Sequence, residues 1–282
     1  MPIRQLGLID SATKYIMIKL SMVTISFNQA AYLPQCIESV LSQSGVDIEY
    51  IVVDPGSTDG SREIIERYRD RIAHVVFEPD QGPADGLNKG FARATGDVYG
   101  FLNSDDVLRP GAIERLCREW RRKPSADVLC GYGAFIDEKG ERLRAIVPSR
   151  MTPWLYAYGG VSFFQQGTFF KAECFEAAGG FNPRNFTCWD AELYVDMALK
   201  GAKFEVVDVD VADFRLHAGS ITGSNRLERQ YLDDRRRLFE KICGNSPSTM
   251  AAVIRPFGRL LKFLHDPTYP VRRLAAARRI RA

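Results

Sequence analysis

The feature of the sequence that most constrains its fold is an alternation of apolar, β-branched runs with amphipathic stretches of about ten residues. Strand-like runs cover residues 18–26, 49–54, 74–78 and 97–102. Helix-like stretches follow them. The first has Asn28 as its expected N-cap and Leu33, Ile37, Val40 and Leu41 on one face, and the others cover residues 61–68, 84–94 and 111–122. This order predicts βαβ units around a mostly parallel sheet, whose ligands bind at the carboxyl ends of the strands.

The alternation loosens after residue 125. Residues 128–136 and 142–147 flank a turn at residues 138–141 and predict a hairpin. A short strand is expected at 168–170, a helix at 190–200 closed by Gly201, and a strand at 203–209. Two tail helices are expected, marked by Leu227, Tyr231, Leu238, Phe239 and Ile242, and by Met250, Val253, Ile254, Phe257, Leu260, Leu261 and Leu264. The chain therefore divides into a leader (1–17), an α/β domain (18–222) and a helical C-terminal appendage (223–282).

Composition narrows the class of protein. The formal net charge of +3 is too small to indicate a nucleic-acid partner. The six cysteines form no C-x-x-C pair, which favours reduced thiols in a cytoplasmic protein. We expect no secretory signal and no membrane span, because no run of 18 apolar residues occurs.

Two polar loops follow predicted strands. The first, residues 54–61, offers Asp54 and Asp59 with two glycines and three hydroxyls, a set suited to hydrogen bonds with a base or a ribose. The second is Asn103-Ser104-Asp105-Asp106, whose adjacent carboxylates repel each other unless a divalent cation is present. A capped surface turn explains the first loop equally simply. A solvated acidic turn explains the second loop less well, because an apolar strand delivers the two carboxylates to a single point.

Three segments in this order resemble the family 2 glycosyltransferases of the GT-A fold: SMVTISFNQAAYLPQCIESVLSQ, IVVDPGSTDGS and EPDQGPADGLNKGFARATGDVYGFLNSDD. The resemblance extends from about residue 20 to about residue 220. It implies a Rossmann-like, mostly parallel sheet flanked by helices, and a nucleotide-sugar donor bound with Mn²⁺ or Mg²⁺. The residues it assigns to the nucleotide-sugar are Thr24, Ser26, Asn28, Asp54, Asp80, Asn88, Lys89, Asn103, Ser104 and Asp105, with Asp106 on the metal. Asn103 stands where many relatives have the first Asp of D-x-D.

Residues 186–193 resemble the segment of the family that carries the catalytic base. Asp190 keeps the family's Asp, whereas Trp189 stands where Glu is common. The base would take the proton of an acceptor hydroxyl, and burial beside Trp189 would raise the pKa of Asp190 toward a useful range. The simpler alternative is that Asp190 only caps the helix that follows, and Glu192 is the substitute candidate for the base.

Two later segments complete the resemblance. Residues 165–170 resemble an acceptor-side segment, and His217 resembles a late His that joins the metal in some relatives, where imidazole suits Mn²⁺ better than Mg²⁺. A lone His is otherwise more often structural.

The tail combines an apolar stripe with the basic residues Arg255, Arg259, Lys262, Arg272, Arg273, Arg278, Arg279 and Arg281. Such helices either bind anionic lipid at a membrane surface or pack on the catalytic domain with a solvated basic face. The sequence thus predicts an inverting glycosyltransferase, with a UDP-sugar as the favoured donor and a saccharide or lipid-linked saccharide as acceptor, acting in cell-surface polysaccharide or lipopolysaccharide synthesis. The competing hypothesis is a non-catalytic nucleotide-sugar-binding or scaffold protein of the same fold. A dehydrogenase and a P-loop enzyme are excluded, because G-x-G-x-x-G and G-x-x-x-x-G-K-[ST] are absent.

Overall fold

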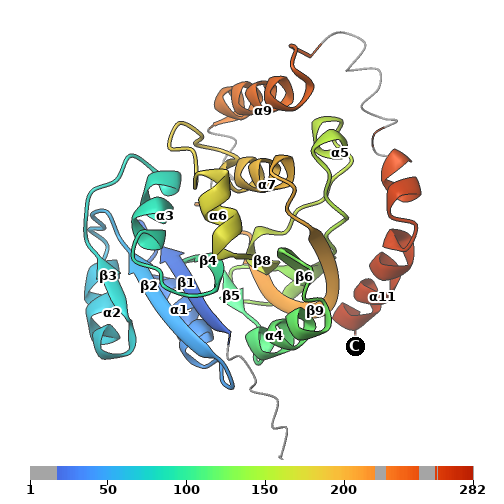
Figure 1. Cartoon of the computed structure of the whole chain (residues 1–282). Coiled ribbons are helices and arrows are strands. Elements are labelled where there is room, and N and C mark those ends of the chain that lie inside the picture. The colour runs from blue at the N-terminus through green and yellow to red at the C-terminus, as the bar shows by residue number, and fades with distance from the viewer. Residues whose placement is uncertain (1–17, 220–226, 248–257, 259, 282) are drawn as a thin grey trace, which may run out of the picture.

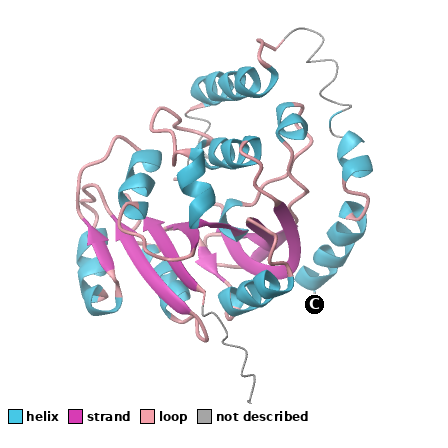
Figure 2. Cartoon of the chain, in the orientation of Figure 1, coloured by secondary structure: helices cyan, strands magenta, loops and turns pink. Residues whose placement is uncertain are grey.

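A computed structural model describes residues 18–219, 227–247, 258 and 260–281 of the 282-residue chain. In these residues one curved sheet is flanked by helices on both faces, and the C-terminal helices lie along one side (Figures 1 and 2). The strands are β1 (Lys19–Ile25), β2 (Asp47–Val53), β3 (His74–Val76), β4 (Val98–Asn103), β5 (Val107–Leu108), β6 (Val128–Ile136), β7 (Arg142–Ile146), β8 (Thr168–Lys171) and β9 (Phe204–Arg215). The helices are α1 (Leu33–Leu41), α2 (Ser61–Arg67), α3 (Pro83–Phe91), α4 (Ala112–Arg122), α5 (Pro153–Ala157), α6 (Ala172–Ala178), α7 (Trp189–Leu199), α9 (Glu228–Cys243) and α11 (Tyr269–Arg281).

The sheet has a parallel half and a mixed half. Its strand order is β3-β2-β1-β4-β8-β6-β9-β5, with β7 paired to β6. Strands β1 to β4 are parallel, as the βαβ pattern predicts. Strand β8 is antiparallel to both β4 and β6, while β9 runs parallel to β6 and antiparallel to β5. The parallel half brings the ends of β1, β2 and β4 to one edge of the sheet.

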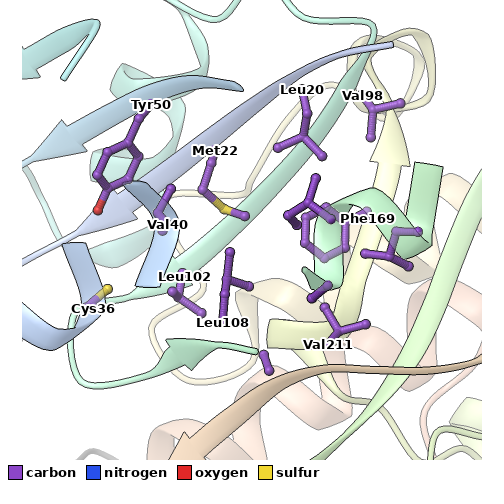
Figure 3. Close-up of a cluster of buried hydrophobic side chains, with 14 of the residues drawn as sticks. Leu20, Met22, Cys36, Val40, Tyr50, Val98, Leu102, Leu108, Phe169 and Val211 are labelled. Atoms are coloured by element: carbon purple, nitrogen blue, oxygen red, sulfur yellow. The ribbon is translucent and has the colours of Figure 1, made fainter. Parts of the chain in front are cut away.

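Both faces of the parallel half are buried, which explains the near-continuous apolar sequence of its strands. Successive side chains point to opposite faces, so Met22 packs with α1 and α4 while Val23 packs under α3. Figure 3 shows the first of these layers, in which Met22, Leu102 and Phe169 meet between strands and helices. Gly90 lets α3 approach β1, because a Cβ atom there would lie 2.5 Å from Val23.

The two described C-terminal helices pack on the α/β unit. Helix α9 lies on α5 and α7 and buries Leu238 and Phe239. Helix α11 lies along β7, and it buries Tyr269 and Ala276 in a cluster with Tyr132. Packing on the α/β unit is therefore observed for α9 and α11, and it leaves the apolar side chains of Val271 and Leu274 on α11 exposed. Among the described residues, none of the helices combines the length and the apolar content needed to cross a bilayer.

Several expectations need correction. Asn28 does not cap a helix: α1 begins at Leu33 after Tyr32, and the Asn28 side chain instead accepts a hydrogen bond from the Thr58 N–H (2.9 Å). Strand β9 continues to Arg215, beyond the predicted end at residue 209, because it pairs with β6 along its length. The short elements β5, α5 and α6 and the helix α11 were not expected. The predicted leader and the tail residues Met250 to Phe257 lie outside the described residues.

Candidate active site

A cavity of about 710 Å³ opens where β1, β2 and β4 end. The register of the sheet sets Ile25 of β1 beside Asn103 of β4, so the residues that follow each strand meet at one place. Two sets of residues line it, which we call its polar half and its apolar half. The polar half comes from the ends of β1 to β4 and the loops after them, and consists of Ser26, Phe27, Gln29, Pro55, Asp80, Gly82, Asn103, Ser104 and Asp105. Five of the predicted nucleotide-sugar residues thus line it together: Ser26, Asp80, Asn103, Ser104 and Asp105.

The carboxylate of Asp105, in this half of the cavity, contacts the imidazole of His217. Asp105 Oδ2 lies 2.9 Å from His217 Nε2, and the Tyr32 ring packs on the imidazole. Two neighbouring oxygens, Ser26 Oγ and Asn103 Oδ1, are buried without a hydrogen-bond partner in the described structure. A carboxylate, an imidazole and an unpartnered amide oxygen are ligands that suit Mn²⁺ together with a diphosphate. The residues present therefore fit a divalent cation, although no group of three or more His, Cys, Asp or Glu gathers among the described residues.

Asp106 lies behind Asp105 and does not line the cavity. Its side chain is fully buried, with Oδ2 accepting from Gln166 Nε2 (2.7 Å) and Oδ1 from the Arg215 N–H (2.9 Å). Burial, reinforced by the charge of Asp105, raises the pKa of Asp106 well above its usual value. Of the two carboxylates, Asp105 lines the cavity, whereas Asp106, the residue predicted to bind the metal, does not.

Arg215 is a central residue that the sequence analysis did not single out. Its side chain is 1% exposed, and its guanidinium donates to the carbonyl of Asp105 (2.8 Å) and to Gln35 Oε1 (2.6 Å). Further hydrogen bonds reach the carbonyls of Asp137 and Glu138, and the group lies over the Tyr32 ring. Arg215 therefore connects the acidic loop to α1 and to the β6–β7 turn. An arginine at the end of an apolar strand was the available signal.

Asp54 is positioned to shape its loop. Its carboxylate is fully buried and accepts from the N–H groups of Gly56 (3.0 Å) and Ser57 (2.8 Å), from the Ser57 hydroxyl and from Arg62 Nε (3.1 Å). Its neighbour Pro55, rather than Asp54, lines the cavity. Asn28 joins the same loop from the end of β1. The predicted contact of Asp54 with the base stays a prediction.

Three further residues predicted to bind the nucleotide-sugar, Thr24, Asn88 and Lys89, do not line the cavity. Thr24 is buried and accepts from the Tyr50 hydroxyl (3.0 Å). Asn88 bonds both backbone groups of Phe181 (2.8 and 2.9 Å), which joins α3 to the loop after α6. Lys89 contacts the Pro79 carbonyl and Asp85. Lys89 thus supports the segment that carries Asp80, which does line the cavity.

The carboxylate of Asp80 lines the cavity, unlike those of Asp54 and Asp106, which lie behind its wall. Burial raises its pKa, while the N–H of Gly82 donates to its Oδ1 (2.9 Å) and so favours the ionised form. It faces the same half of the cavity as Ser26 and Asp105.

Asp190, in the first turn of α7, also lines the cavity. Burial raises its pKa, and backbone N–H groups only partly oppose that shift. Glu192 is different: it is 1% exposed, it is paired with Arg237 and Lys241, and its pKa is lowered to about 2. A carboxylate so fully paired is a weak base that does not face the cavity, which removes Glu192 as the substitute base.

The other lining residues, the apolar half, are mainly apolar. Strands β6, β7 and β9 contribute Phe135, Ile146 and Phe214, loops contribute Phe163 and Phe164, and α7 contributes Trp189 next to Asp190. The polar residues among them are already engaged, since Gln165 donates to the Phe101 carbonyl and Gln166 to Asp106. Apart from Trp189, no sequence pattern predicts these apolar residues, because they are scattered along the chain.

Comparison with known proteins identifies the family. Residues 21–178, more than half of the chain, match the family model described as Glycosyl transferase family 2. The chain belongs to glycosyl transferase family 2. Strands β1 to β4 and β8, with the acidic loop, lie inside the matched region of this family 2 protein. The Asp190 segment, Arg215 and His217 lie beyond it.

Curated relatives agree with this assignment. The chain is 27% identical over 218 residues to an uncharacterized glycosyltransferase of Nostoc sp., a match that covers 72% of this chain and 66% of the relative. It is 36% identical over 121 residues to the putative teichuronic acid biosynthesis glycosyltransferase TuaG of Bacillus subtilis, a match that covers 42% of this chain and 48% of TuaG. The matched part thus spans between about half and two thirds of these relatives.

Solved structures share the fold. TarS 1–349 of S. aureus in complex with UDP-GlcNAc aligns with a TM-score of 0.65 at 17% identity, over 88% of this chain and 73% of TarS 1–349. The mannosyltransferase PcManGT of Pyrobaculum calidifontis, in complex with GDP-Man and Mn²⁺, aligns with a TM-score of 0.61 at 17% identity. This match covers 93% of this chain and 74% of PcManGT. The fold is therefore the GT-A fold that the sequence predicts.

Proposed function

We propose that this family 2 protein transfers a sugar from a nucleotide-sugar donor, a UDP-sugar in the first instance, to an acceptor hydroxyl with inversion. The observation that carries the proposal is the placement of Asp190, with its raised pKa, in one cavity with Ser26, Asp80, Ser104 and Asp105. One half of the cavity offers polar groups to a nucleotide diphosphate, and the other offers a base beside an apolar wall.

The chemistry follows from these residues. In its ionised form Asp190 accepts the proton of the acceptor hydroxyl while that oxygen forms a bond to the anomeric carbon of the donor. The bond between that carbon and the diphosphate oxygen breaks, and the nucleoside diphosphate leaves with the electron pair. Attack from the side opposite the leaving group inverts the anomeric centre. A raised pKa makes Asp190 a better base than an ordinary aspartate.

Asp105 and His217 are the residues that would hold a divalent cation, with Asn103 Oδ1 close enough in sequence to contribute. A cation there would neutralise charge on the diphosphate leaving group. Asp106 would orient this set from behind through Gln166 and Arg215. The Mn²⁺ bound with GDP-Man in the PcManGT complex supports the choice of metal.

The choice of a UDP-sugar rests on likeness. The fold neighbour TarS 1–349 is described in complex with UDP and with UDP-GlcNAc, whereas PcManGT is described with GDP-Man. The name of TuaG, teichuronic acid biosynthesis, supports a role in making a cell-surface polysaccharide or lipopolysaccharide, with a saccharide or lipid-linked saccharide as acceptor.

Calorimetry tests the donor site. UDP, GDP and dTDP are titrated with and without Mn²⁺ into the wild-type protein and into the Asp105→Ala variant. We expect Mn²⁺-dependent binding of one nucleotide and its loss in Asp105→Ala, because that substitution removes the carboxylate that faces the cavity. Binding of no nucleotide under either condition would contradict the proposal.

We also propose peripheral contact of the tail with anionic membrane. Exposed apolar side chains, Leu264, Val271 and Leu274, lie on the described tail together with Arg273 and Arg278. Apolar contacts and basic charge act together on anionic lipid. Vesicles of phosphatidylglycerol should sediment the wild-type protein but less of a Leu264→Ser, Leu274→Ser variant. Equal sedimentation of the two would contradict membrane contact.

A further inference from the structure

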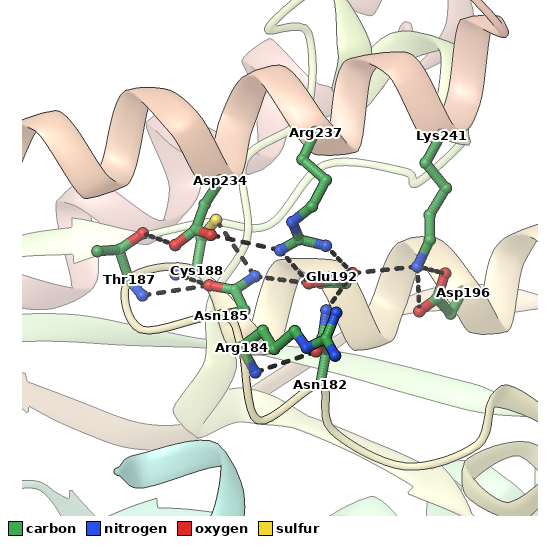
Figure 4. Close-up of polar contacts among 10 residues, drawn as sticks. All are labelled: Asn182, Arg184, Asn185, Thr187, Cys188, Glu192, Asp196, Asp234, Arg237 and Lys241. Atoms are coloured by element: carbon green, nitrogen blue, oxygen red, sulfur yellow. Dashed lines mark hydrogen bonds and ion pairs between the residues drawn. The ribbon is translucent and has the colours of Figure 1, made fainter. Parts of the chain in front are cut away.

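An ionic network around the buried carboxylate of Glu192 joins the C-terminal helix α9 to the helix that carries Asp190. Arg237 of α9 donates through both terminal nitrogens to Glu192 of α7, at 2.5 and 2.7 Å (Figure 4). Lys241, one turn further along α9, reaches Glu192 (3.1 Å) and Asp196 (2.7 Å). Two-point pairing of a guanidinium with a carboxylate fixes direction as well as distance. The network therefore sets where α7 lies relative to α9.

The same carboxylate holds the loop that leads into α7. Glu192 accepts hydrogen bonds from the side-chain amides of Asn182 (3.1 Å) and Asn185 (2.8 Å). Asn185 Oδ1 in turn accepts from the backbone N–H groups of Thr187 (3.2 Å) and Cys188 (2.9 Å), as Figure 4 shows.

Helix α9 holds this loop a second time. The Thr187 hydroxyl donates to Asp234 Oδ2 of α9 (2.7 Å), and Arg237 also contacts Asp234. Thr187 and Asp190 both line the cavity. The chain from Arg237 through Glu192 and Asn185 therefore ends at the first turn of α7, where Asp190 stands.

The energetics favour a positioning role for this network. Glu192 is 1% exposed, and its hydrogen bonds hold its pKa at about 2, so it is ionised throughout the physiological range. An apolar pair of similar volume often stabilises a fold as well as a buried ion pair does. Directional hydrogen bonds to Asn182 and Asn185 are what an apolar pair cannot supply.

We propose that Arg237 is a positioning residue for the reaction: through Glu192 and Asn185 it holds the first turn of α7 so that Asp190 faces the acceptor hydroxyl. This inference rests on the proposed function. It makes α9, which lies outside the family-matched region, a working part of the active site.

The experiment compares Arg237→Met with Arg236→Met. Arg236 is the matched control, because it lies on the same helix and its exposed ion pair joins only Glu240. Two readouts are taken: deuterium exchange of the amides at residues 185–192, and release of nucleoside diphosphate from UDP-GlcNAc and GDP-mannose in the presence of Mn²⁺. In Arg237→Met we expect faster exchange and a kcat lowered on the order of 10²-fold, with the donor KM unchanged, because a small misplacement of a reacting group has that effect.

Two further variants separate positioning from stability. Arg237→Lys should recover part of kcat, since Lys supplies charge without the planar fork. The double variant Glu192→Met, Arg237→Met removes the buried carboxylate together with its guanidinium partner and should keep the melting temperature near that of the wild type. Its kcat should nonetheless stay low, because Asn185 has lost its acceptor.

The outcomes are distinct. Exchange and kcat in Arg237→Met that match those of Arg236→Met would overturn the inference, as would full activity of the double variant. A wild-type protein that releases no nucleotide would contradict the proposed function, while the exchange comparison would still decide whether Arg237 orders residues 185–192.

Discussion

The two halves of the cavity are built in different ways. The polar half comes from residues directly after β1 and β4, so Ser26 and Asp105 follow their strands within a few positions. The apolar half is assembled from Phe135, Phe163 and Phe214, which come from distant elements. The residues of the polar half lie next to the ends of their strands in the sequence. The residues of the apolar half come together only after β6, β7 and β9 have paired. The donor side is therefore the part that a family motif can record.

The largest expected effect on stability comes from replacing Arg215. This residue joins the two halves, because it lies at the end of β9 and donates to the carbonyl of Asp105. Its replacement in Arg215→Met leaves several carbonyls and Gln35 without a donor and removes the cation near Asp106. We expect the free energy of unfolding to fall by about 3–5 kcal/mol, as for other broken buried charge networks. Denaturant unfolding measures this change.

Arg144→Met is the matched control for Arg215→Met. Arg144 also lies over an aromatic ring, that of Phe135, but it is exposed. We expect a loss below about 1 kcal/mol. Equal losses in the two variants would mean that Arg215 does not join the halves.

The next prediction concerns the stability of the fold in acid and compares two buried carboxylates, Glu192 of α7 and Glu49 of β2. Glu192 and Glu49 each have a pKa lowered from 4.5 to about 2 by hydrogen bonds. A lowered pKa stabilises the fold above pH 4.5, and this contribution is lost as pH falls from 4.5 toward 2. A shift of that size corresponds to about 3 kcal/mol for the well-buried Glu192.

Glu192→Gln and Glu49→Gln should therefore both be less stable at pH 7 and lose less stability on acidification than the wild type. Urea unfolding at pH 7, 4.5 and 3 tests this. Only Glu192→Gln should also lower kcat, because Glu49 holds β1 and β2 together at the far end from the cavity. An acid profile of Glu192→Gln identical to that of the wild type would contradict the pairing of Glu192.

The smallest expected effect separates the halves directly. Phe214 lines the apolar wall and meets Phe135 edge-on at 5.5 Å between ring centroids. Phe214→Leu should cost below about 1.5 kcal/mol of stability and leave the nucleotide Kd unchanged. Asp80→Asn should weaken binding of the nucleotide-sugar. A weaker nucleotide Kd in Phe214→Leu would show that the wall belongs to the donor side.

How much could be predicted follows the same division. The parallel strands, their helices and Asp105 could be predicted, because apolar runs and the loops after them are adjacent in sequence. The mixed order around β8 could not, since pairing of β4 with β8 joins residues about 70 positions apart. Motif likeness also pointed to Asp54 and Asn88, but burial and hydrogen bonds place them behind the cavity wall. Which of two adjacent carboxylates faces the cavity depends on Arg215 and Gln166, and no local pattern shows that.

The most direct test of the account is to separate binding from chemistry at Asp190. The Asp190→Asn variant should bind the nucleotide with the affinity of the wild type in Mn²⁺, because Asp190 is proposed to act on the acceptor hydroxyl and not on the nucleotide. Its release of nucleoside diphosphate should fall by about 10²–10⁴-fold, the usual contribution of a general base. Wild-type turnover in Asp190→Asn, measured alongside unchanged binding, would contradict the assignment of Asp190 as the base.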